Sequence, residues 1–142
     1  MSSGRTRHAT SDSGLLERLL EDGYDFFTGV PDSGLRTFIG DLASLPPGRH
    51  VQATWEAEAV GIAAGAFLAG RKPVVYLQNA GLGHVVNPLA SLCIPYGIDV
   101  LLVVGHRHTL PQHRVMGEID ERLLELLGWT NYLLVTGDNN EG

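Results

Sequence analysis

Glu56 is the residue in this sequence whose position is best suited to chemistry. It follows a short predicted strand and begins a predicted helix over 56–69. A carboxylate in the first turn of a helix is favoured by the helix dipole, so a purely structural role is one interpretation. The helix is almost free of bulky side chains on several faces and contains Gly61 and Gly65. Because glycine inside a helix costs about 1 kcal/mol relative to alanine, these glycines predict close packing, either structural, at a subunit interface or beneath a cofactor.

A second corner, Gln78-Asn79-Ala80-Gly81-Leu82-Gly83, follows a predicted strand and opens a predicted helix. We expect Gly81 and Gly83 to adopt positive φ and to bring backbone N–H groups near a ligand, although a simple tight turn also explains them. The corner is not a dinucleotide-binding fingerprint, because the third glycine of that motif would fall at Val86. It is not a phosphate-binding loop either, since no Gly-Lys-Ser/Thr follows.

Basic residues gather in one segment of an otherwise acidic chain, namely His106, Arg107, His108, His113 and Arg114. An ordinary solvated loop is one interpretation. The other is a clamp for a small anion, because the guanidinium group of Arg matches the geometry of carboxylate, phosphonate or sulfonate. The sequence contains no CxxC, HExxH or other paired ligand spacing, so we expect this chain to form no metal site by itself.

Composition narrows the classes of function. The 142 residues, of which 44% are hydrophobic and 18% charged, are typical of one globular domain. A net charge of −6 argues against binding to nucleic acid or to an anionic membrane. Cys93, the single cysteine, has no internal disulfide partner and is expected to be a small buried residue in a reducing compartment. Since no apolar run reaches roughly 18 residues and no signal core is present, we expect a cytoplasmic location.

Predicted strands and helices alternate along the chain. Strands are expected at 24–30, 51–54, 74–77, 98–104 and 131–135, with helices between them, including 84–93 and 118–127. This alternation predicts an α/β fold, a three-layer, doubly wound, mostly parallel sheet with helices on both faces. Residues 1–10 are expected to be a flexible tail, 11–136 one domain and 137–142 a polar tail. In such a sheet ligands bind at the carboxyl ends of the strands, where Glu56, the glycine corner and the basic segment all fall.

Together these motifs resemble the pyrimidine-binding domain of thiamine diphosphate-dependent decarboxylases, over about 15–135. The segment Glu56 to Gly65 looks like the family's Glu-bearing helix, with a glycine nine positions after the acid. Several segments resemble phosphonopyruvate decarboxylases: Gly29-Val-Pro-Asp-Ser33 with Arg36, Tyr76 to Gly83 with Asn87 to Leu92, and Pro111-Gln-His113 with Gly117. Others resemble the α subunit of sulfopyruvate decarboxylases: Glu56-x-Glu58, Ala66 to Gly70 and His106-Arg107.

The resemblance implies a role for each matching residue. Glu56 is the expected catalytic residue: its carboxylate, beside the pyrimidine N1′ of thiamine diphosphate, would favour the tautomer that activates the thiazolium C2. The expected cofactor-binding residues are Glu56, Asn79, Gly81, Leu82 and Gly83. The expected substrate-binding residues, for the anionic end of a 2-keto acid, are Asp32, Ser33, Arg36, His106 and Arg107.

The resemblance also implies a partner. In this family a diphosphate-binding domain carries a Gly-Asp-Gly motif and a downstream Asn that hold Mg²⁺, and the segment Gly137-Asp138-Asn139 is read as a tail instead. We therefore expect a separate β subunit, in an α2β2 or similar heteromer, that supplies Mg²⁺ and the diphosphate site. Two departures from the family pattern are His84, where Asn is expected, and an end of the chain before a further helix and strand.

Three functions remain open at this point. The first is a subunit that decarboxylates 3-phosphonopyruvate to phosphonoacetaldehyde, and the second is the same architecture acting on 3-sulfopyruvate. The third belongs to another class, a non-catalytic binding subunit that keeps the fold. Glu56 is dispensable only in the third.

Overall fold

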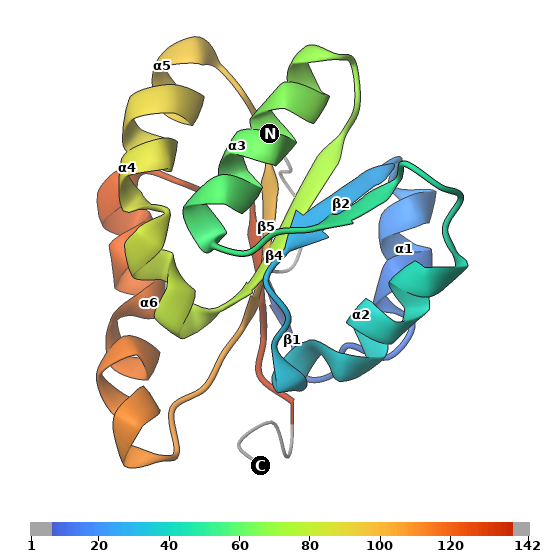
Figure 1. The fold of residues 1–142 in the computed structure, drawn as a ribbon. Coiled ribbons are helices and arrows are strands. Elements are labelled where there is room, and N and C mark those ends of the chain that lie inside the picture. The colour runs from blue at the N-terminus through green and yellow to red at the C-terminus, as the bar shows by residue number, and fades with distance from the viewer. Residues whose placement is uncertain (1–6, 138–142) are drawn as a thin grey trace.

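The computed structural model of the chain describes residues 7–137, and its centre is a six-stranded, all-parallel sheet (Figure 1). The strands are β1 (His8–Ala9), β2 (Phe26–Gly29), β3 (His50–Gln52), β4 (Pro73–Gln78), β5 (Leu101–Gly105) and β6 (Tyr132–Val135). Their order across the sheet is β1-β6-β5-β4-β2-β3. The chain therefore moves outward from β2 to β3, then crosses back to β4 on the other side of β2.

Helices cover both faces of this sheet, as Figure 1 shows. One face carries α1 (Leu15–Glu21) and α2 (Arg36–Asp41). The other carries α3 (Glu56–Leu68), α6 (Arg114–Leu127) and a segment that contains the short helices α4 (Val86–Pro88) and α5 (Ile94–Tyr96). The predicted α/β, three-layer, doubly wound architecture is confirmed, and the sheet is fully parallel among the described residues.

Two apolar cores explain why the central strands read as continuous hydrophobic runs. Alternate residues of β5 point to opposite faces: Leu102 and Val104 pack under α3 and α6, whereas Leu101 and Val103 pack under α1 and α2. All five residues of β5 are buried. A strand covered on both faces needs apolar residues at every position, and this removes the alternation that a half-exposed strand would show.

The predicted flexible tail over 1–10 is wrong at His8 and Ala9. These two residues form β1 and pair in parallel with Leu134 and Val135 at the edge of the sheet. The backbone N–H of Leu134 donates to the carbonyl of Arg7 at 2.7 Å. Residues 1–6 and most of the predicted polar tail, 138–142, lie outside the described residues.

The predicted helix 84–93 is replaced by a broken one. A 3₁₀ stretch, Asn79–His84, leads into α4, then a π-type turn over Leu89–Cys93, then α5. Pro88 and Pro95 lack the N–H that a regular α-helix requires in its interior, which accounts for the irregular hydrogen bonding. By contrast, α6 begins at Arg114, four residues before the predicted 118.

None of the helices within 7–137 is both long enough and apolar enough to cross a membrane.

Candidate active site

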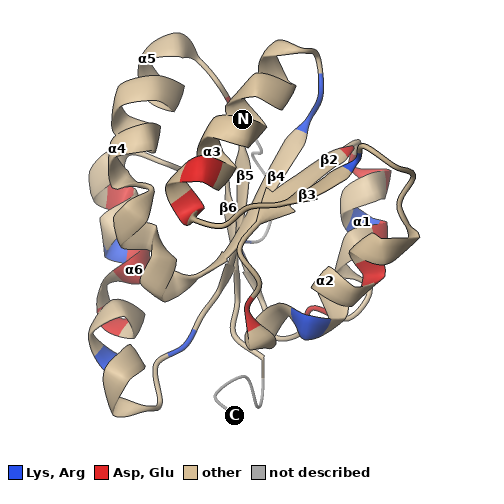
Figure 2. Cartoon of the chain, in the orientation of Figure 1, with Lys and Arg blue, Asp and Glu red and all other residues tan. Residues whose placement is uncertain are grey.

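Glu56 lies at the carboxyl edge of the sheet, where α3 begins after β3. Trp55, in an extended conformation, precedes the first helical residue. The first turn of α3 is acidic because it holds Glu56 and Glu58 (Figure 2). The side chain of Glu56 is 15% exposed, so its carboxylate is largely sheltered but open at one side.

Gly81 lies directly against this carboxylate. A Cβ atom at Gly81 would stand 2.6 Å from Glu56 Oε2, 2.7 Å from its Cγ and 2.8 Å from its Cδ. A side chain at position 81 would fit only if the Glu56 side chain moved, so the absence of a side chain at Gly81 is what allows this close approach. The predicted positive φ of Gly81 and Gly83 is wrong, because neither is among the glycines with positive φ.

His84 contacts the other oxygen of the same carboxylate. Its Nδ1 lies 2.8 Å from Glu56 Oε1, and a carboxylate is an acceptor, so Nδ1 donates. The imidazole ring also meets the ring of Trp55 edge-on, with centroids 6.1 Å apart and an interplanar angle of 67°. The departure from the family pattern noted at position 84 thus falls on the candidate catalytic group itself.

Glu58, the second acid of the pair, has a different role. The backbone N–H of Thr54 donates to Glu58 Oε1 at 2.7 Å, and the Thr54 hydroxyl donates to the same atom at 3.0 Å. These hydrogen bonds lower the pKa of the Glu58 carboxyl below its usual value. Glu58 therefore satisfies a backbone donor just before α3, much as the acid of a capping box does.

A buried polar network joins the glycine corner to the basic segment. Asn79 is fully buried, and its amide nitrogen donates to the carbonyl of Arg107 at 2.8 Å and to Asp120 Oδ2 at 3.1 Å. The same Asp120 oxygen accepts from His106 Nδ1 at 2.6 Å. Asp120 Oδ1 accepts from the backbone N–H of Glu121. Because Gln78 and Gly105 are register partners, the residues that follow them begin side by side and the network locks them together.

Asp32 and Arg107 form a second buried pair at the same edge. Arg107 Nε lies 3.2 Å from Asp32 Oδ1, and their side chains are only 9% and 1% exposed. The guanidinium group of Arg107 also donates to the hydroxyl of Ser33. A side chain on Gly105 would collide with Asp32 Oδ2, so glycine at the end of β5 makes room for this pair. Arg107 is thus already matched by an acid within the chain.

The structure brings most of the predicted site residues to one edge, but with unequal access to a ligand. Glu56, Gly83 and Ser33 reach the surface, and Arg36 is exposed at the start of α2. Asn79, Gly81 and Leu82 are buried and support the corner from beneath. His106 is partly buried against Asp120 and stacks on His108 with ring centroids 4.8 Å apart. The binding roles of all these residues stay predictions.

Sequence reasoning missed Asp120 and did not assign a role to His84. Asp120 had a signal: it follows Met116 by four residues and precedes Leu124 by four, which places an acid on the apolar face of α6. It is 3% exposed, as that position requires. An acid on a buried stripe predicts a buried partner, here His106 and Asn79. His84 had no such signal, because its contact with Glu56 joins segments 28 residues apart.

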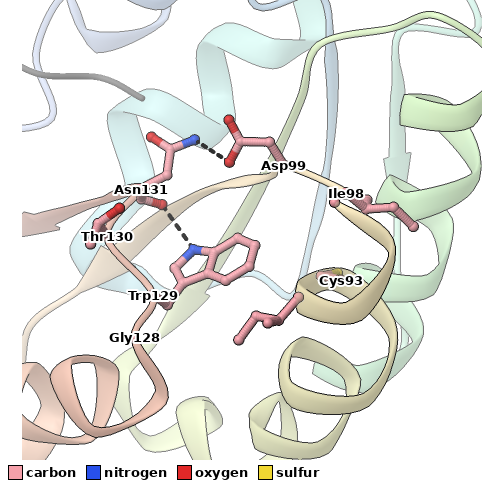
Figure 3. Close-up of a pocket in the computed structure, with 9 residues that line it drawn as sticks. Cys93, Ile98, Asp99, Gly128, Trp129, Thr130 and Asn131 are labelled. Atoms are coloured by element: carbon pink, nitrogen blue, oxygen red, sulfur yellow. Dashed lines mark hydrogen bonds between the residues drawn. The ribbon is translucent and has the colours of Figure 1, made fainter.

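A hollow of about 360 Å³ opens at the opposite edge of the sheet, away from these residues. Figure 3 shows Cys93 and Trp129 among its lining residues, with Asp99 accepting from the amide of Asn131. The hollow precedes β5 and β6, at their amino ends. Burial, and then the charge of Asp99, raises the pKa of the Cys93 thiol to about 11, so its thiolate is scarce at neutral pH. Cys93 is therefore a weak nucleophile, and the predicted site residues lie at the other end of the strands.

The chain is similar to one protein family and to several decarboxylases. The profile described as "Thiamine pyrophosphate enzyme, N-terminal TPP binding domain" matches residues 10–124. The sulfopyruvate decarboxylase subunit alpha of Methanothermobacter thermautotrophicus is 37% identical over 124 residues, which cover 82% of this chain and 74% of that protein. The phosphonopyruvate decarboxylase of Streptomyces viridochromogenes is 38% identical over 117 residues, covering 79% of this chain and 30% of that protein.

A solved structure shares the fold at low sequence identity. The 2-oxoglutarate:ferredoxin oxidoreductase from Magnetococcus marinus superposes with a TM-score of 0.63 and 16% identity, over 91% of this chain and 28% of that one. At this identity the likeness concerns the arrangement of helices and strands alone.

Proposed function

The chain belongs to the thiamine pyrophosphate enzymes, as their N-terminal TPP-binding domain, and from this we propose that it is the pyrimidine-binding α subunit of a split 2-keto acid decarboxylase. Thiamine pyrophosphate, or thiamine diphosphate, supplies the electron sink for loss of CO₂ from a 2-keto acid. In our proposal Glu56 is the catalytic residue of this chain.

The observation that carries the proposal is the set of contacts made by the two oxygens of the Glu56 carboxylate. Its Oε1 is fixed by His84, whereas Oε2 faces Gly81 and accepts no hydrogen bond from the described residues. A sheltered carboxylate with one open oxygen fits a heterocycle whose ring nitrogen must be held protonated. Because the side chain is 15% exposed, the local dielectric is lower than in water and the contact is correspondingly stronger. The residues present therefore fit the pyrimidine of the cofactor.

We propose that a separate β subunit completes the site, holding Mg²⁺ and the diphosphate. The α3 surface supports this: Gly61 and Gly65 are exposed and a Cβ there would meet nothing within 4 Å, so any close packing they serve lies outside this chain. Trp55 and Leu68, at the two ends of the same helix, are 53% and 74% exposed. Three relatives carry the words "subunit alpha" in their names. Tight Mg²⁺-dependent binding of the cofactor by this chain alone would contradict the proposal.

For the substrate we place 3-sulfopyruvate first and 3-phosphonopyruvate second. The sulfopyruvate α subunits from Methanothermobacter thermautotrophicus and Methanococcus maripaludis match this chain over 74% and 69% of their own lengths, as expected for chains of the same architecture. The identity of 38% to a phosphonopyruvate decarboxylase keeps that acid in second place, ahead of other 2-keto acids. This reverses the order expected from the first-corner motifs. Aldehyde release from each acid by the reconstituted complex separates the two.

The test of Glu56 is a matched pair of acid-to-amide substitutions in the reconstituted complex. Glu56→Gln should lower turnover by roughly 10²-fold or more, because an amide cannot hold the ring nitrogen protonated. Glu58→Gln, two residues along the same helix, alters only the capping hydrogen bonds of Thr54 and should keep turnover near wild type. Equal activity of Glu56→Gln and wild type would refute the catalytic role and favour a non-catalytic subunit.

A further inference from the structure

His84 and Glu56 form a local unit at the rim of the candidate site. His84 is 57% exposed on its side chain, and Glu56 only 15%. The imidazole is held from two directions, by Glu56 Oε1 at 2.8 Å from Nδ1 and by the edge-on contact with Trp55. The contact spans two elements, because His84 ends the 3₁₀ corner and Glu56 begins α3. The ring therefore fixes the corner relative to the helix at the point where a ligand would enter.

The two carboxylate oxygens of Glu56 have different surroundings. Oε1 takes the Nδ1–H donor of His84, a charge-assisted hydrogen bond. Oε2 is the atom closest to the Cβ position of Gly81, at 2.6 Å, so it lies in the space that the missing side chain of Gly81 leaves free. Without the bond to His84, the carboxylate could rotate about its terminal torsion, which is broad and roughly two-fold in Glu. With the bond to His84, Oε1 is held in place and the orientation of Oε2 is fixed as well.

We propose that His84 is a positioning residue for Glu56: its Nδ1–H holds Oε1 and leaves Oε2 aimed at the ring nitrogen of the cofactor. This inference rests on the function proposed above. In this proposal Nδ1 of the imidazole holds the Glu56 carboxylate, and Nε2 has no part in holding it. The proposal also gives position 84 a specific requirement, a donor at the δ position of the side chain.

Side-chain isosteres make that requirement testable. The amide nitrogen of Asn occupies nearly the place of Nδ1, that of Gln nearly the place of Nε2, and Phe keeps the ring without a donor. His84→Asn should therefore rescue positioning, whereas His84→Gln and His84→Phe should not. His8 offers a matched control. Its Nε2 lies 2.8 Å from Oε2 of Glu121, its side chain is 54% exposed, and the pair lies beside the edge strand β1. His8→Phe removes an equivalent His–Glu pair.

The first readout needs no cofactor. Two-dimensional ¹H–¹⁵N spectra of the isolated chain at pH 8 give the tautomer of each neutral imidazole. We expect His84 to carry its proton on Nδ1, as donation to Glu56 requires. A proton on Nε2 instead would overturn the proposal.

The second readout is the rate at which the thiazolium C2 proton of bound thiamine diphosphate exchanges with D₂O, followed by ¹H NMR after acid quench in the reconstituted complex. Exchange should slow by about 10- to 100-fold in His84→Phe and His84→Gln, because a small displacement of a catalytic group has effects of this size. His84→Asn and His8→Phe should stay within about threefold of wild type.

The outcomes separate this inference from the function on which it rests. If the wild-type complex does not accelerate exchange over free cofactor, the proposed function falls and the inference falls with it. If wild type accelerates exchange and His84→Phe does so equally, or faster, only the role of His84 is overturned. If His84→Gln matches His84→Asn, the assignment to Nδ1 is overturned.

Discussion

Gly81→Ala tests the geometry of the site with a single methyl group. The new Cβ would stand 2.6 Å from Glu56 Oε2, against ordinary contacts of 3.4 Å and above. The overlap of about 0.8 Å must be relieved by movement. The atoms in the way are Cγ, Cδ and Oε2 of the flexible Glu56 side chain, so we expect that side chain to move and the backbone to stay in place.

The expected effect on folding is therefore small, whereas the expected effect on catalysis is large. Alanine is compatible with the helical backbone at position 81 and restricts the unfolded chain, which offsets the cost of displacing Glu56, so the free energy of unfolding should change by less than about 1 kcal/mol. A displacement near 1 Å of a catalytic group costs roughly 10²-fold in rate, or about 2.7 kcal/mol in the activation barrier. The variant should be folded and nearly inactive.

The assay is kcat of the reconstituted complex, measured with whichever of the two acids the wild-type complex consumes, beside urea unfolding of the isolated chain. Gly40→Ala is the matched control, because Gly40 lies in α2 with nothing within 4 Å of its Cβ position. It should keep full activity and gain up to about 1 kcal/mol of stability. If Gly81→Ala keeps wild-type kcat, the carboxylate is not seated against Gly81 during catalysis and the proposed geometry is wrong.

Three further predictions concern the support of the site and the two cores. Asp120→Ala should lower the free energy of unfolding by about 3 kcal/mol in urea titrations. The reason is that the substitution removes the acceptor shared by the buried amide of Asn79 and the imidazole of His106. A loss below about 0.5 kcal/mol, the range of surface substitutions, would show that the network is not a buried unit. Cys93, whose thiol pKa burial raises to about 11, should resist Ellman's reagent at pH 8 in the native chain and react fully in urea; rapid native labelling would contradict its burial. Burial lowers the pKa of His50 in the folded chain, so stability should be full above about pH 6.5 and fall as the pH drops from there toward the folded pKa. His50→Gln should flatten that slope in urea midpoints measured at pH 7.5 and 5.5, and an unchanged slope would assign it to other groups.

The parts of the fold that the sequence predicts are those set by local composition. Continuous apolar runs such as β5 identify strands covered on both faces, and the small-residue run after Glu56 identifies α3 to within one residue at its end. The start of β1 could not be predicted, because two polar-flanked residues gain strand geometry only from pairing with β6. The interruption over Leu89–Cys93 was hidden for a similar reason, since Pro88 is tolerated at the beginning of a helix but also permits a π-type turn.

The candidate site divides in the same way. The candidate catalytic carboxylate and the glycine corner could be located from residue types and their places after strands. The reason for a glycine at position 81 could not be predicted. In a sequence, a glycine can serve either a positive φ or the absence of a side chain, and only the position of Glu56 shows that the absence of a side chain matters here. For Arg107 the sequence suggests more than the structure supports. A basic residue in a loop is interpreted as free to bind an anion, and its pairing with Asp32 is visible only in the structure.

The partners of the basic side chains at the carboxyl edge bear on the second chain in our proposal. Three basic side chains there face an acid of this chain: Arg107 faces Asp32, His106 faces Asp120, and His84 faces Glu56. Arg107 is the buried cation among them; it is already matched by Asp32 and has little attraction left for an added anion, and separating one partner from such a pair is costly. The ligands in our proposal carry several negative charges, on the diphosphate and on the sulfonate or phosphonate. Their neutralisation therefore has to come from elsewhere, from Arg36 at the exposed start of α2, and from the cation and basic groups of the partner subunit. On this view the chain supplies the acid that activates the cofactor, and the hydrogen bond from His84 holds that acid in place.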